Sequence, residues 1–214
     1  MMVDKIKKGD FVELDYTAKI VNLDKVFDTT LESVAKDKGI HNKEIKYKPL
    51  VIKVGEGHLV KGLDAFIVDK VPGNYKVELD AENAFGKKNA KLLRLVSIKE
   101  FHKNQIQPVP GLEVELDNHR GVVRTVNGGR VIVDFNHPLS SQDVTYDIHI
   151  KSIVTDPKAK VEAALESFRI PFEQVTFEND KATVTFKTKI PDEIVKPIVD
   201  ELKKMTDVKD VEFK

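Results

Sequence analysis

The segment of residues 55–66, GEGHLVKGLDAF, constrains the fold of this chain most strongly, because its glycines and apolar residues follow a fixed pattern. Gly55, Gly57 and Gly62 permit backbone angles that other residues avoid, which suits a tight loop. Apolar residues then recur at three- and four-residue spacing, which predicts a short amphipathic helix: Leu59, Val60, Leu63 and Phe66. A helix this short needs a surrounding fold to be stable. The segment is compatible with the floor of a shallow apolar pocket and with an ordinary entry into a helix.

The composition excludes several classes of function. The chain has 214 residues, 41% of them hydrophobic, and 35 basic residues balance 35 acidic ones, so its formal net charge is zero. A neutral chain has no bulk attraction to nucleic acid or to an anionic membrane. With no cysteine there is no disulfide and no thiol nucleophile. The first residues lack the apolar core of a signal peptide, and no apolar run approaches the about 20 residues of a membrane span. We therefore expect a cytoplasmic globular protein.

Alternation of apolar and polar side chains predicts the strands of a first domain. Residues 11–20 alternate without a break, which is typical of a half-buried strand. Further strands are predicted at 49–54, at 144–150, and from Val77 to the Ala-Phe-Gly at 84–86, after a Pro-Gly turn at 71–74. These strands predict a sheet that carries the glycine loop and its helix.

The middle of the chain has the character of an inserted unit. Residues 87–130 contain short strands separated by proline and glycine, which predicts a small β-rich domain. The strand pattern of the first domain resumes at 131–135, so this domain is predicted to comprise residues 1–86 and 131–155. Insertion into an exposed loop is a tolerated way to add a domain.

Residues 156–214 predict a third unit with the element order α-β-β-α-β, a two-layer α/β arrangement. Asp156 and Pro157 predict the start of the first helix, since they combine an N-cap residue with proline at the first helical position. Its apolar face is predicted to comprise Val161, Ala164, Leu165 and Phe168. A hairpin is predicted around Asn179-Asp180, then a helix over 192–205 kinked at Pro197, with the apolar residues Ile194, Ile198, Leu202 and Met205, and a last strand at 208–213.

The chain lacks the motifs of most enzymes that use a cofactor, a metal or a covalent intermediate. There is no phosphate-binding glycine loop, no dinucleotide fingerprint and no nucleophile elbow. Its six histidines are scattered and contain no i, i+4 pair of the kind that binds zinc from a helix. We therefore expect no metal, no cofactor and no covalent catalysis.

A set of apolar and aromatic residues near glycine loops carries a resemblance to a known family. The chain resembles the FKBP-type peptidyl-prolyl cis-trans isomerases over about residues 4–154, through Tyr16, Phe27-Asp28, PLVIKVGEGHLVKGL at 49–63, Ala84-Phe85-Gly86 and Asn136-His137-Pro138-Leu139. The inserted unit is similar to the insert-in-flap chaperone domain of the SlyD-like branch, and long archaeal members add a C-terminal domain. The resemblance implies an α+β fold: an FKBP-like antiparallel sheet with a short helix, a small inserted β-rich domain and a C-terminal two-layer α/β domain.

The resemblance also implies a function and a site. It predicts an enzyme that isomerises X-Pro peptide bonds without covalent chemistry in an apolar pocket, and a chaperone that assists protein folding. Its catalytic positions fall on Tyr16, Asp28, Phe85 and Tyr146, and its substrate-binding positions on Phe27, Leu50, Leu59, Val60, Leu63 and Leu139. Where macrolide-binding members have tryptophan and tyrosine, this chain has Leu63 and Phe85, and Ser140-Ser141 replaces a common Ala-Gly. These departures weigh against tight macrolide binding more than against isomerisation, since an apolar pocket remains.

Each predicted site residue has an expected role. Leu63 and Tyr146 are expected to cradle the proline ring, and Asp28 with the Tyr16 phenol to orient the peptide carbonyls. The Val60 amide is expected to hold the substrate chain. The insert is expected to bind unfolded or proline-containing polypeptides through exposed apolar residues, although a polar appendage that only stabilises the flap is the simpler alternative. A homodimer through the sheet edges of the C-terminal domain is a further expectation.

Two rival functions remain open from the sequence. The first is a holdase or peptide-binding module with little isomerase activity, which Leu63 and Phe85 favour. The second is RNA binding by a small barrel over residues 111–135, which contains Arg120, Arg124 and Arg130. Acidic residues interrupt that stretch and aromatic residues are few, which argues against a basic stacking surface, so we expect no nucleic-acid partner and no membrane partner.

Overall fold

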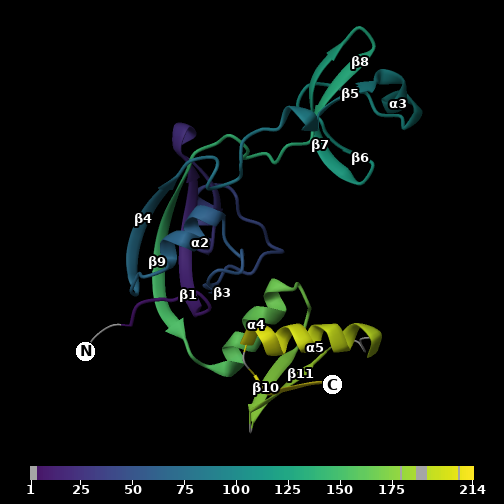
Figure 1. Ribbon diagram of the computed structural model, residues 1–214. Helices are drawn as coiled ribbons and strands as arrows, with labels where there is room; N and C mark the ends of the chain where they lie inside the picture. The colour runs from purple at the N-terminus through teal and green to yellow at the C-terminus, as the bar shows by residue number, and fades with distance from the viewer. Residues whose placement is uncertain (1–3, 179, 187–191, 207) are drawn as a thin grey trace. The chain divides into compact units, whose positions relative to one another are not determined.

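The computed structural model describes residues 4–178, 180–186, 192–206 and 208–214, and for residues 192–194 it describes the backbone alone. The chain forms two compact units (Figure 1): Met1–Leu79 together with Val144–Lys214, and Asp80–Asp143. Sheets of five, three and four strands are combined with short helices. The predicted α+β class is therefore confirmed. The exact boundaries predicted for the three domains stay a prediction.

The first unit is built on a five-stranded sheet in the order β2-β1-β9-β4, with β3 also paired to β1. Its strands are β1 (Phe11–Ile20), β2 (Lys25–Thr29), β3 (Leu50–Lys53), β4 (Gly73–Leu79) and β9 (Val144–Val154). All the pairings are antiparallel, and β9 pairs with β1 from one end to the other. Along its other edge β1 pairs with two short strands, with β3 near its start and with β2 near its end. This strand therefore fixes the position of every other strand except β4.

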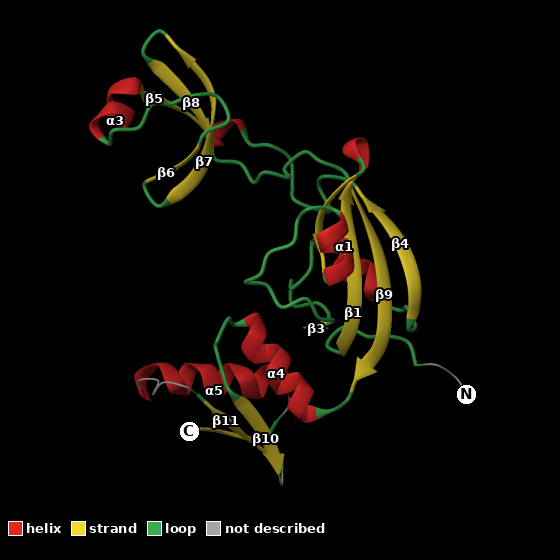
Figure 2. Ribbon diagram, turned by 180° about the vertical axis from the view of Figure 1, so that it is seen from behind, coloured by secondary structure: helices red, strands yellow, loops and turns green. Residues whose placement is uncertain are grey.

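The predicted alternation in β1 is confirmed, because Val12, Leu14 and Ala18 are fully buried. Two short helices, α1 (Glu32–Asp37) and α2 (Lys61–Ile67), and a 3-10 turn, η1 (Val21–Leu23), complete this part. Figures 1 and 2 show the two helices from opposite sides of the molecule. Helix α1 was not predicted, since its six residues are too few to show a helical period.

The glycine loop leads into a helix, but that helix begins at Lys61, two residues later than the apolar pattern indicated. Leu59 and Val60 therefore lie in the loop. The Gly55 amide donates to Asp64 Oδ1 across 2.9 Å, which ties the loop to the first turn of α2. Gly55 has a φ of 91°, and a Cβ there would lie 2.6 Å from Lys8 Cγ, so this position requires glycine.

The strand predicted from Val77 to residues 84–86 ends earlier, at Leu79. Beyond it the backbone turns: the Ala84 amide donates to the Asp80 carbonyl across 3.1 Å and the Gly86 amide to the Ala81 carbonyl across 2.6 Å. The apolar residues Ala81, Ala84 and Phe85 continue the strand pattern in the sequence. In the structure the backbone makes these local hydrogen bonds in place of hydrogen bonds to a neighbouring strand.

The last part of the first unit has the predicted order α-β-β-α-β in two layers, helices on one side of the strands (Figure 2). It comprises α4 (Pro157–Ser167), β10 (Gln174–Glu178), β11 (Lys181–Thr185), α5 (Asp192–Thr206) and β12 (Asp210–Phe213), with β12 parallel to β11.

Its predicted details are mostly confirmed. Asp156 caps α4 by accepting from the Lys158 and Ala159 amides. The prediction that Phe168 belongs to the buried face of α4 is wrong: it follows the helix and is 37% exposed, while Ala163 is buried. Asn179 and the Ile194 side chain lie outside what the structure describes.

The C-terminal layer shares its hydrophobic core with the five-stranded sheet. Phe11, at the start of β1, is only 2% exposed and belongs to the same cluster as residues of α4, α5 and β10 to β12. Val51 of β3 and Val154 of β9 also pack against this cluster. Lys160 of α4 places its ammonium 5.7 Å from the centre of the Phe11 ring. Burial of Phe11 therefore depends on the C-terminal layer.

The second unit is a four-stranded antiparallel sheet in the order β5-β8-β7-β6. It comprises η2 (Ala90–Leu92), β5 (Leu93–Ser97), α3 (Ile98–Lys103), β6 (Glu113–Leu116), β7 (His119–Asn127) and β8 (Arg130–Asp134). Phe101 of α3 is 1% exposed and forms the hydrophobic core of this unit together with Val114, Val123, Val131 and Val133.

One predicted strand of the first domain belongs to this second sheet. The apolar run at 131–135 forms β8, which pairs with β5 and β7 and not with the strands of the first unit. Apolar alternation shows that a strand has a buried face, but the choice of its partners depends on contacts distant in sequence. Helix α3 was also not predicted, and Ser97 caps it by accepting from the Lys99 amide.

We predict that Phe11→Ala lowers the free energy of unfolding by about 3 kcal/mol or more, the range for removing a buried phenylalanine ring. Leu23→Ala, at a side chain that is 66% exposed, is the control and is expected to change it by less than about 0.5 kcal/mol. Denaturant unfolding measures both variants. A Phe11→Ala effect as small as that of the control would contradict the shared core.

Candidate functional site

The strand register brings three of the predicted catalytic residues together on one face of the sheet. Ala18 of β1 is paired with Asp28 of β2 on one side and with Tyr146 of β9 on the other. Directly paired residues point to the same face, and so does Tyr16, two positions earlier in β1. The small Ala18 side chain therefore lies between a carboxylate and two phenol rings.

These side chains contact one another. The Tyr16 hydroxyl donates to Asp28 Oδ2 across 2.6 Å. The rings of Tyr16 and Tyr146 have centroids 5.9 Å apart at an interplanar angle of 55°, and Phe27 meets Tyr146 edge-on at 6.4 Å and 89°. We call Tyr16, Phe27, Asp28 and Tyr146 the aromatic cluster. It combines an apolar surface with one exposed carboxylate whose position a phenol fixes.

A polar network behind the cluster holds β1 and the end of β2 in register. The Thr30 hydroxyl donates to Asp15 Oδ1 across 2.7 Å and accepts from the Tyr16 amide at 3.0 Å. The Thr30 amide in turn donates to the Tyr16 carbonyl across 3.0 Å. Asp15 is only 9% exposed, and Lys151 pairs with it at 2.9 Å. Because both backbone groups of Tyr16 are held, its phenol reaches Asp28 from a fixed position.

Sequence reasoning missed this network. No role was predicted from the sequence for Thr29 or Thr30, and Asp15 was only one polar position in the alternating strand at 11–20. Thr29 donates its hydroxyl to the Tyr16 carbonyl and is 6% exposed. The run Asp-Thr-Thr at 28–30, beside a strand with an inward-facing acid, was the available signal.

Burial changes the protonation of both phenols. It raises the pKa of Tyr16 far above its ordinary value, with further contributions from the hydrogen bond to Asp28 and from its charge. It also raises the pKa of Tyr146 to about 12, with a smaller contribution from the Asp28 charge. Both phenols are therefore neutral hydrogen-bond donors throughout the ordinary pH range.

The predicted substrate-binding residues of β3, the glycine loop and α2 differ in accessibility. Leu50, Leu59 and Val60 are half-buried. Leu63 is fully buried, so a substrate reaches it only if a neighbouring side chain moves. The Val60 carbonyl accepts from the Leu63 and Asp64 amides. Its own amide donates no hydrogen bond within the described part of the chain.

Phe85 and Leu139, the remaining predicted residues, belong to the second unit. There the Phe85 ring stacks on the His137 imidazole, with centroids 4.8 Å apart and planes at 2°. The Ser141 amide donates to the Gly86 carbonyl across 2.8 Å, which joins the two connections of the insert. That Phe85 and Leu139 act together with the aromatic cluster stays a prediction.

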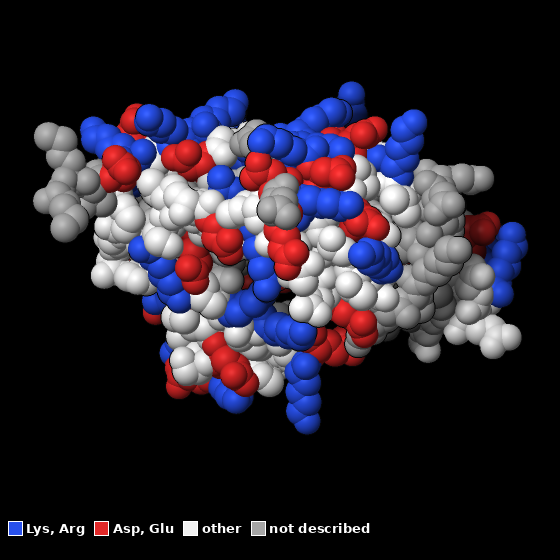
Figure 3. Space-filling model, turned by 90° about the horizontal axis from the view of Figure 1, so that it is seen from below, with Lys and Arg blue, Asp and Glu red and all other residues white. Residues whose placement is uncertain are grey.

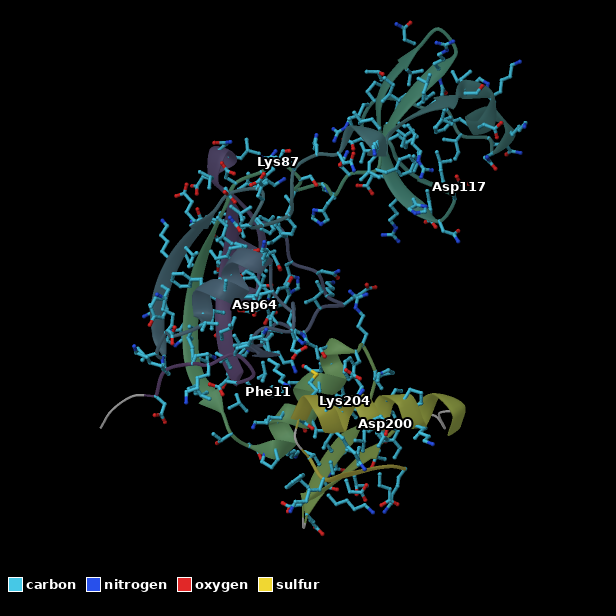
Figure 4. All side chains as sticks on the ribbon, in the orientation of Figure 1. Phe11, Asp64, Lys87, Asp117, Asp200 and Lys204 are labelled. Atoms are coloured by element: carbon cyan, nitrogen blue, oxygen red, sulfur yellow. The ribbon has the colours of Figure 1, made fainter. Side chains whose placement is uncertain are left out.

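The described residues include neither a metal-binding cluster nor a membrane-spanning helix. Within them, no group of three or more His, Cys, Asp and Glu side chains is arranged to hold a metal ion. No helix that they form is long and apolar enough to cross a membrane. Figure 4 shows how the side chains are distributed over the ribbon.

Comparison with known proteins identifies the class to which this fold and cluster belong. A family model described as "FKBP-type peptidyl-prolyl cis-trans isomerase" matches residues 3–101, and one described as "FKBP26, IF domain" matches residues 94–139. A crystal structure of the three FKBP domains of wheat FKBP73 covers 73% of this chain and 43% of that chain, with a TM-score of 0.37 and 18% identity.

Two relatives are similar over most of their own length. The chain is 33% identical over 112 residues to the FKBP-type 16 kDa peptidyl-prolyl cis-trans isomerase of Escherichia coli, covering 50% of this chain and 74% of that protein. It is 28% identical over 153 residues to the short-type peptidyl-prolyl cis-trans isomerase of Methanocaldococcus jannaschii, covering 71% and 96%. This chain belongs to the FKBP-type peptidyl-prolyl cis-trans isomerase family, as its motifs predicted, and its similarity to these relatives supports a SlyD-like member.

We predict that two of the four tyrosines ionise well above the ordinary value of about 10. In the unfolded chain the tyrosines ionise near the ordinary value. The contribution of the buried, neutral Tyr146 to the free energy of unfolding is therefore fully present below about pH 10. It is lost as the pH rises through the folded-state pKa of about 12. Phenolate absorbance during a pH titration measures this, with Tyr16→Phe removing one late step. Ionisation of all four near pH 10 in the folded protein would contradict the cluster.

Proposed function

We propose that this chain catalyses cis/trans isomerisation of X-Pro peptide bonds at the aromatic cluster and assists the folding of other proteins. The observation that carries the proposal is the hydrogen bond from Tyr16 to Asp28 beside the Tyr146 ring, in a member of a family of peptidyl-prolyl isomerases. The cluster has an apolar surface for a proline ring and a polar edge for peptide groups.

The reaction needs no bond between enzyme and substrate. Rotation about an X-Pro bond faces a barrier of roughly 20 kcal/mol, because amide resonance is lost in the twisted state. The planar amide is more dipolar than the twisted one, so an apolar site that excludes water favours the twisted state. Hydrogen bonds that hold the flanking peptide groups lower the cost of orientation.

Most residues of the proposed site keep the role that the sequence predicted, but Leu63, which was expected to cradle the proline ring, is fully buried. The Tyr146 ring cradles the proline ring, above the core to which Leu63 contributes, and Phe27, Leu50 and Leu59 extend the apolar surface. Asp28 and the Tyr16 phenol orient peptide groups of the substrate, and the Val60 amide donates to one of its carbonyls. We propose, as predicted, a catalytic role for Phe85 and a substrate-binding role for Leu139.

The insert is proposed to bind unfolded polypeptides through an exposed apolar patch on its sheet. Leu95 of β5 is paired with Ile132 of β8, so both point to one face, together with Leu93. Their side chains are 60%, 36% and 45% exposed, while the opposite face packs on Phe101. We call Leu93, Leu95 and Ile132 the insert patch. Exposed apolar residues so grouped are typical of interaction surfaces, and tethering a client there raises its concentration at the isomerase site.

The rival functions predict different behaviour. A holdase would use the insert patch without catalysis, and the slow step of proline-limited folding would then be unaffected. RNA binding would require a basic surface on the insert. On the face of the molecule seen from below in Figure 3, Lys and Arg side chains are interspersed with Asp and Glu. In the proposed barrel itself Arg120 lies 4.0 Å from Glu115, and Arg124 pairs with Asp134. A cytoplasmic location stays a prediction.

We predict that Asp28→Asn lowers kcat/KM for a proline tetrapeptide roughly tenfold, because it removes the charge but keeps the shape of a side chain that orients the substrate. Asp24→Asn is the matched control, since Asp24 is an exposed acid directly before β2, the strand that carries Asp28. Tyr146→Phe, which keeps the ring, is expected to retain most activity. Equal rates for Asp28→Asn and the control would remove Asp28 from the site.

The structure changes one expectation about Tyr146. Tyr146 was expected to line the site, but it is only 5% exposed in a central strand, so its ring also supports the fold. Removing so large a buried ring is expected to cost several kcal/mol, about 3 to 5 by analogy with other aromatic truncations. Tyr146→Phe is therefore the informative substitution.

We predict that the double variant Leu93→Ser, Leu95→Ser weakens binding of a permanently unfolded protein about tenfold, because it removes the most exposed part of the insert patch. Tetrapeptide isomerisation is expected to be unchanged. Val109→Ser, at an apolar residue that is 50% exposed in a loop of the same unit, is the control. Calorimetric titration measures binding, and equal affinities of the two variants would support the polar-appendage alternative.

A homodimer through the C-terminal sheet is the last part of the proposal. The strand order β10-β11-β12 leaves β10 and β12 as edges, which are common dimerisation surfaces. The outer face is polar, with Thr176 and Thr183 paired on it, so the edges and not an apolar face would form the contact. Light scattering on the full chain is expected to give twice the monomer mass, and a monomer at all concentrations would contradict this.

A further inference from the structure

A cleft of about 600 Å³ separates β3 and the glycine loop from the helices of the C-terminal layer. One wall is formed by Leu50–Lys53 and by Glu56, Gly57 and His58. The other is formed by the end of α4 with Phe168, which follows it, and by the α5 residues Glu201, Lys204 and Met205. Figure 4 labels Lys204 on α5. Of the residues that line it, only Leu50 was assigned a functional role from the sequence.

The two walls are tied together by specific contacts. Lys53 Nζ donates to the Met205 carbonyl across 2.9 Å, and its side chain is only 14% exposed. That carbonyl lies in the last turn of α5, where a cation is favoured by the helix dipole. Lys48 pairs with Glu166 of α4. Together with the core around Phe11 these contacts hold the cleft open at a defined width.

The chemistry of the walls suits an extended polypeptide. Strand β3 pairs with β1 on one edge, and among the described strands it has no partner on the other. The backbone groups of that second edge are available to a further strand. Apolar surface is supplied by Leu50, Val51 and Phe168, and the charged groups of the rim are of both signs, with Lys204 and Glu201 paired at 3.4 Å. Neither an anionic nor a cationic ligand is favoured.

The cleft shares a lining residue with the proposed isomerase site. Leu50 lines the cleft and is one of the proposed substrate-binding residues, and Gly57 and His58 directly precede Leu59 and Val60. A client chain that runs along β3 from the isomerase site would therefore reach the cleft at Leu50. Four residues of β3 span about 13 Å, enough to pair with about four residues of the client.

We propose that this cleft binds a segment of the client polypeptide in extended conformation, added to the free edge of β3, on one side of the proline. The inference rests on the proposed function, because it assigns a subsite to that same reaction. The C-terminal layer then contributes to substrate affinity, and its contribution grows with the length of the client.

The test introduces a large side chain into the cleft from the wall that α4 forms. Ser167 is exposed at the end of α4 and lines the cleft, so Ser167→Trp narrows it without disturbing a core. Thr176→Trp is the matched control, since Thr176 is exposed on the outer face of β10, away from the helices. Phe168→Ser is a second variant that removes apolar surface from the same wall. Each is assayed on a proline tetrapeptide and on an uncharged peptide that extends about six residues beyond the proline on each side.

For the long peptide we expect Ser167→Trp to raise KM about fivefold with kcat unchanged, and Phe168→Ser to raise it about threefold. The tetrapeptide constants and all constants of Thr176→Trp are expected to equal those of the unmodified protein. Equal KM values for Ser167→Trp and Thr176→Trp on the long peptide, or equal losses on both peptides, would overturn the cleft as a subsite. Failure of the unmodified protein to isomerise either peptide would instead overturn the proposed function.

Discussion

The hydrogen bonds of Thr30 are the constraint on which the proposed site depends. This hydroxyl accepts from the Tyr16 amide and donates to Asp15, so one side chain fixes the backbone of β1 and the end of β2 together. The register that results pairs Ala18 with Asp28 and with Tyr146, which sets the distance between the phenol of Tyr16 and the carboxylate. Asp15 is buried, and Lys151 neutralises its charge. Removing Lys151 would leave an unpaired charge in a buried position, which is strongly destabilising.

Strand β1 also joins the site to the rest of the first unit. Its start places Phe11 in the core of the C-terminal layer, and five residues later it supplies Tyr16 to the aromatic cluster. Its other edge is divided between β3, which lines the cleft, and β2, which carries Asp28. Strand β1 therefore connects the C-terminal core, the aromatic cluster and the cleft within the first unit. The insert has a separate core and its own apolar patch.

Local signals made much of the fold predictable. The alternation of residues 11–20, the Asp156-Pro157 helix start and the order of the C-terminal elements depend on neighbours in sequence, and the structure confirms them. Predictions were wrong where distant partners decide the outcome. Residues 131–135 show the pattern of a strand but not which sheet it joins. No role was predicted for Phe11, because its burial depends on the C-terminal layer, which is distant in sequence. At the site, the aromatic residues and Asp28 were predicted from family motifs, whereas Thr30 and Asp15 were missed because their roles depend on register.

The central claim is that the first unit accelerates rotation about X-Pro bonds. It is tested most directly by following the refolding of a small protein whose slow phase is limited by proline isomerisation, with and without catalytic amounts of this chain. The account predicts a slow-phase rate that rises in proportion to the concentration of the unmodified protein and that rises far less with Asp28→Asn. A slow phase unchanged by the unmodified protein, with the client nevertheless bound, would contradict the account and leave a binding module without catalysis.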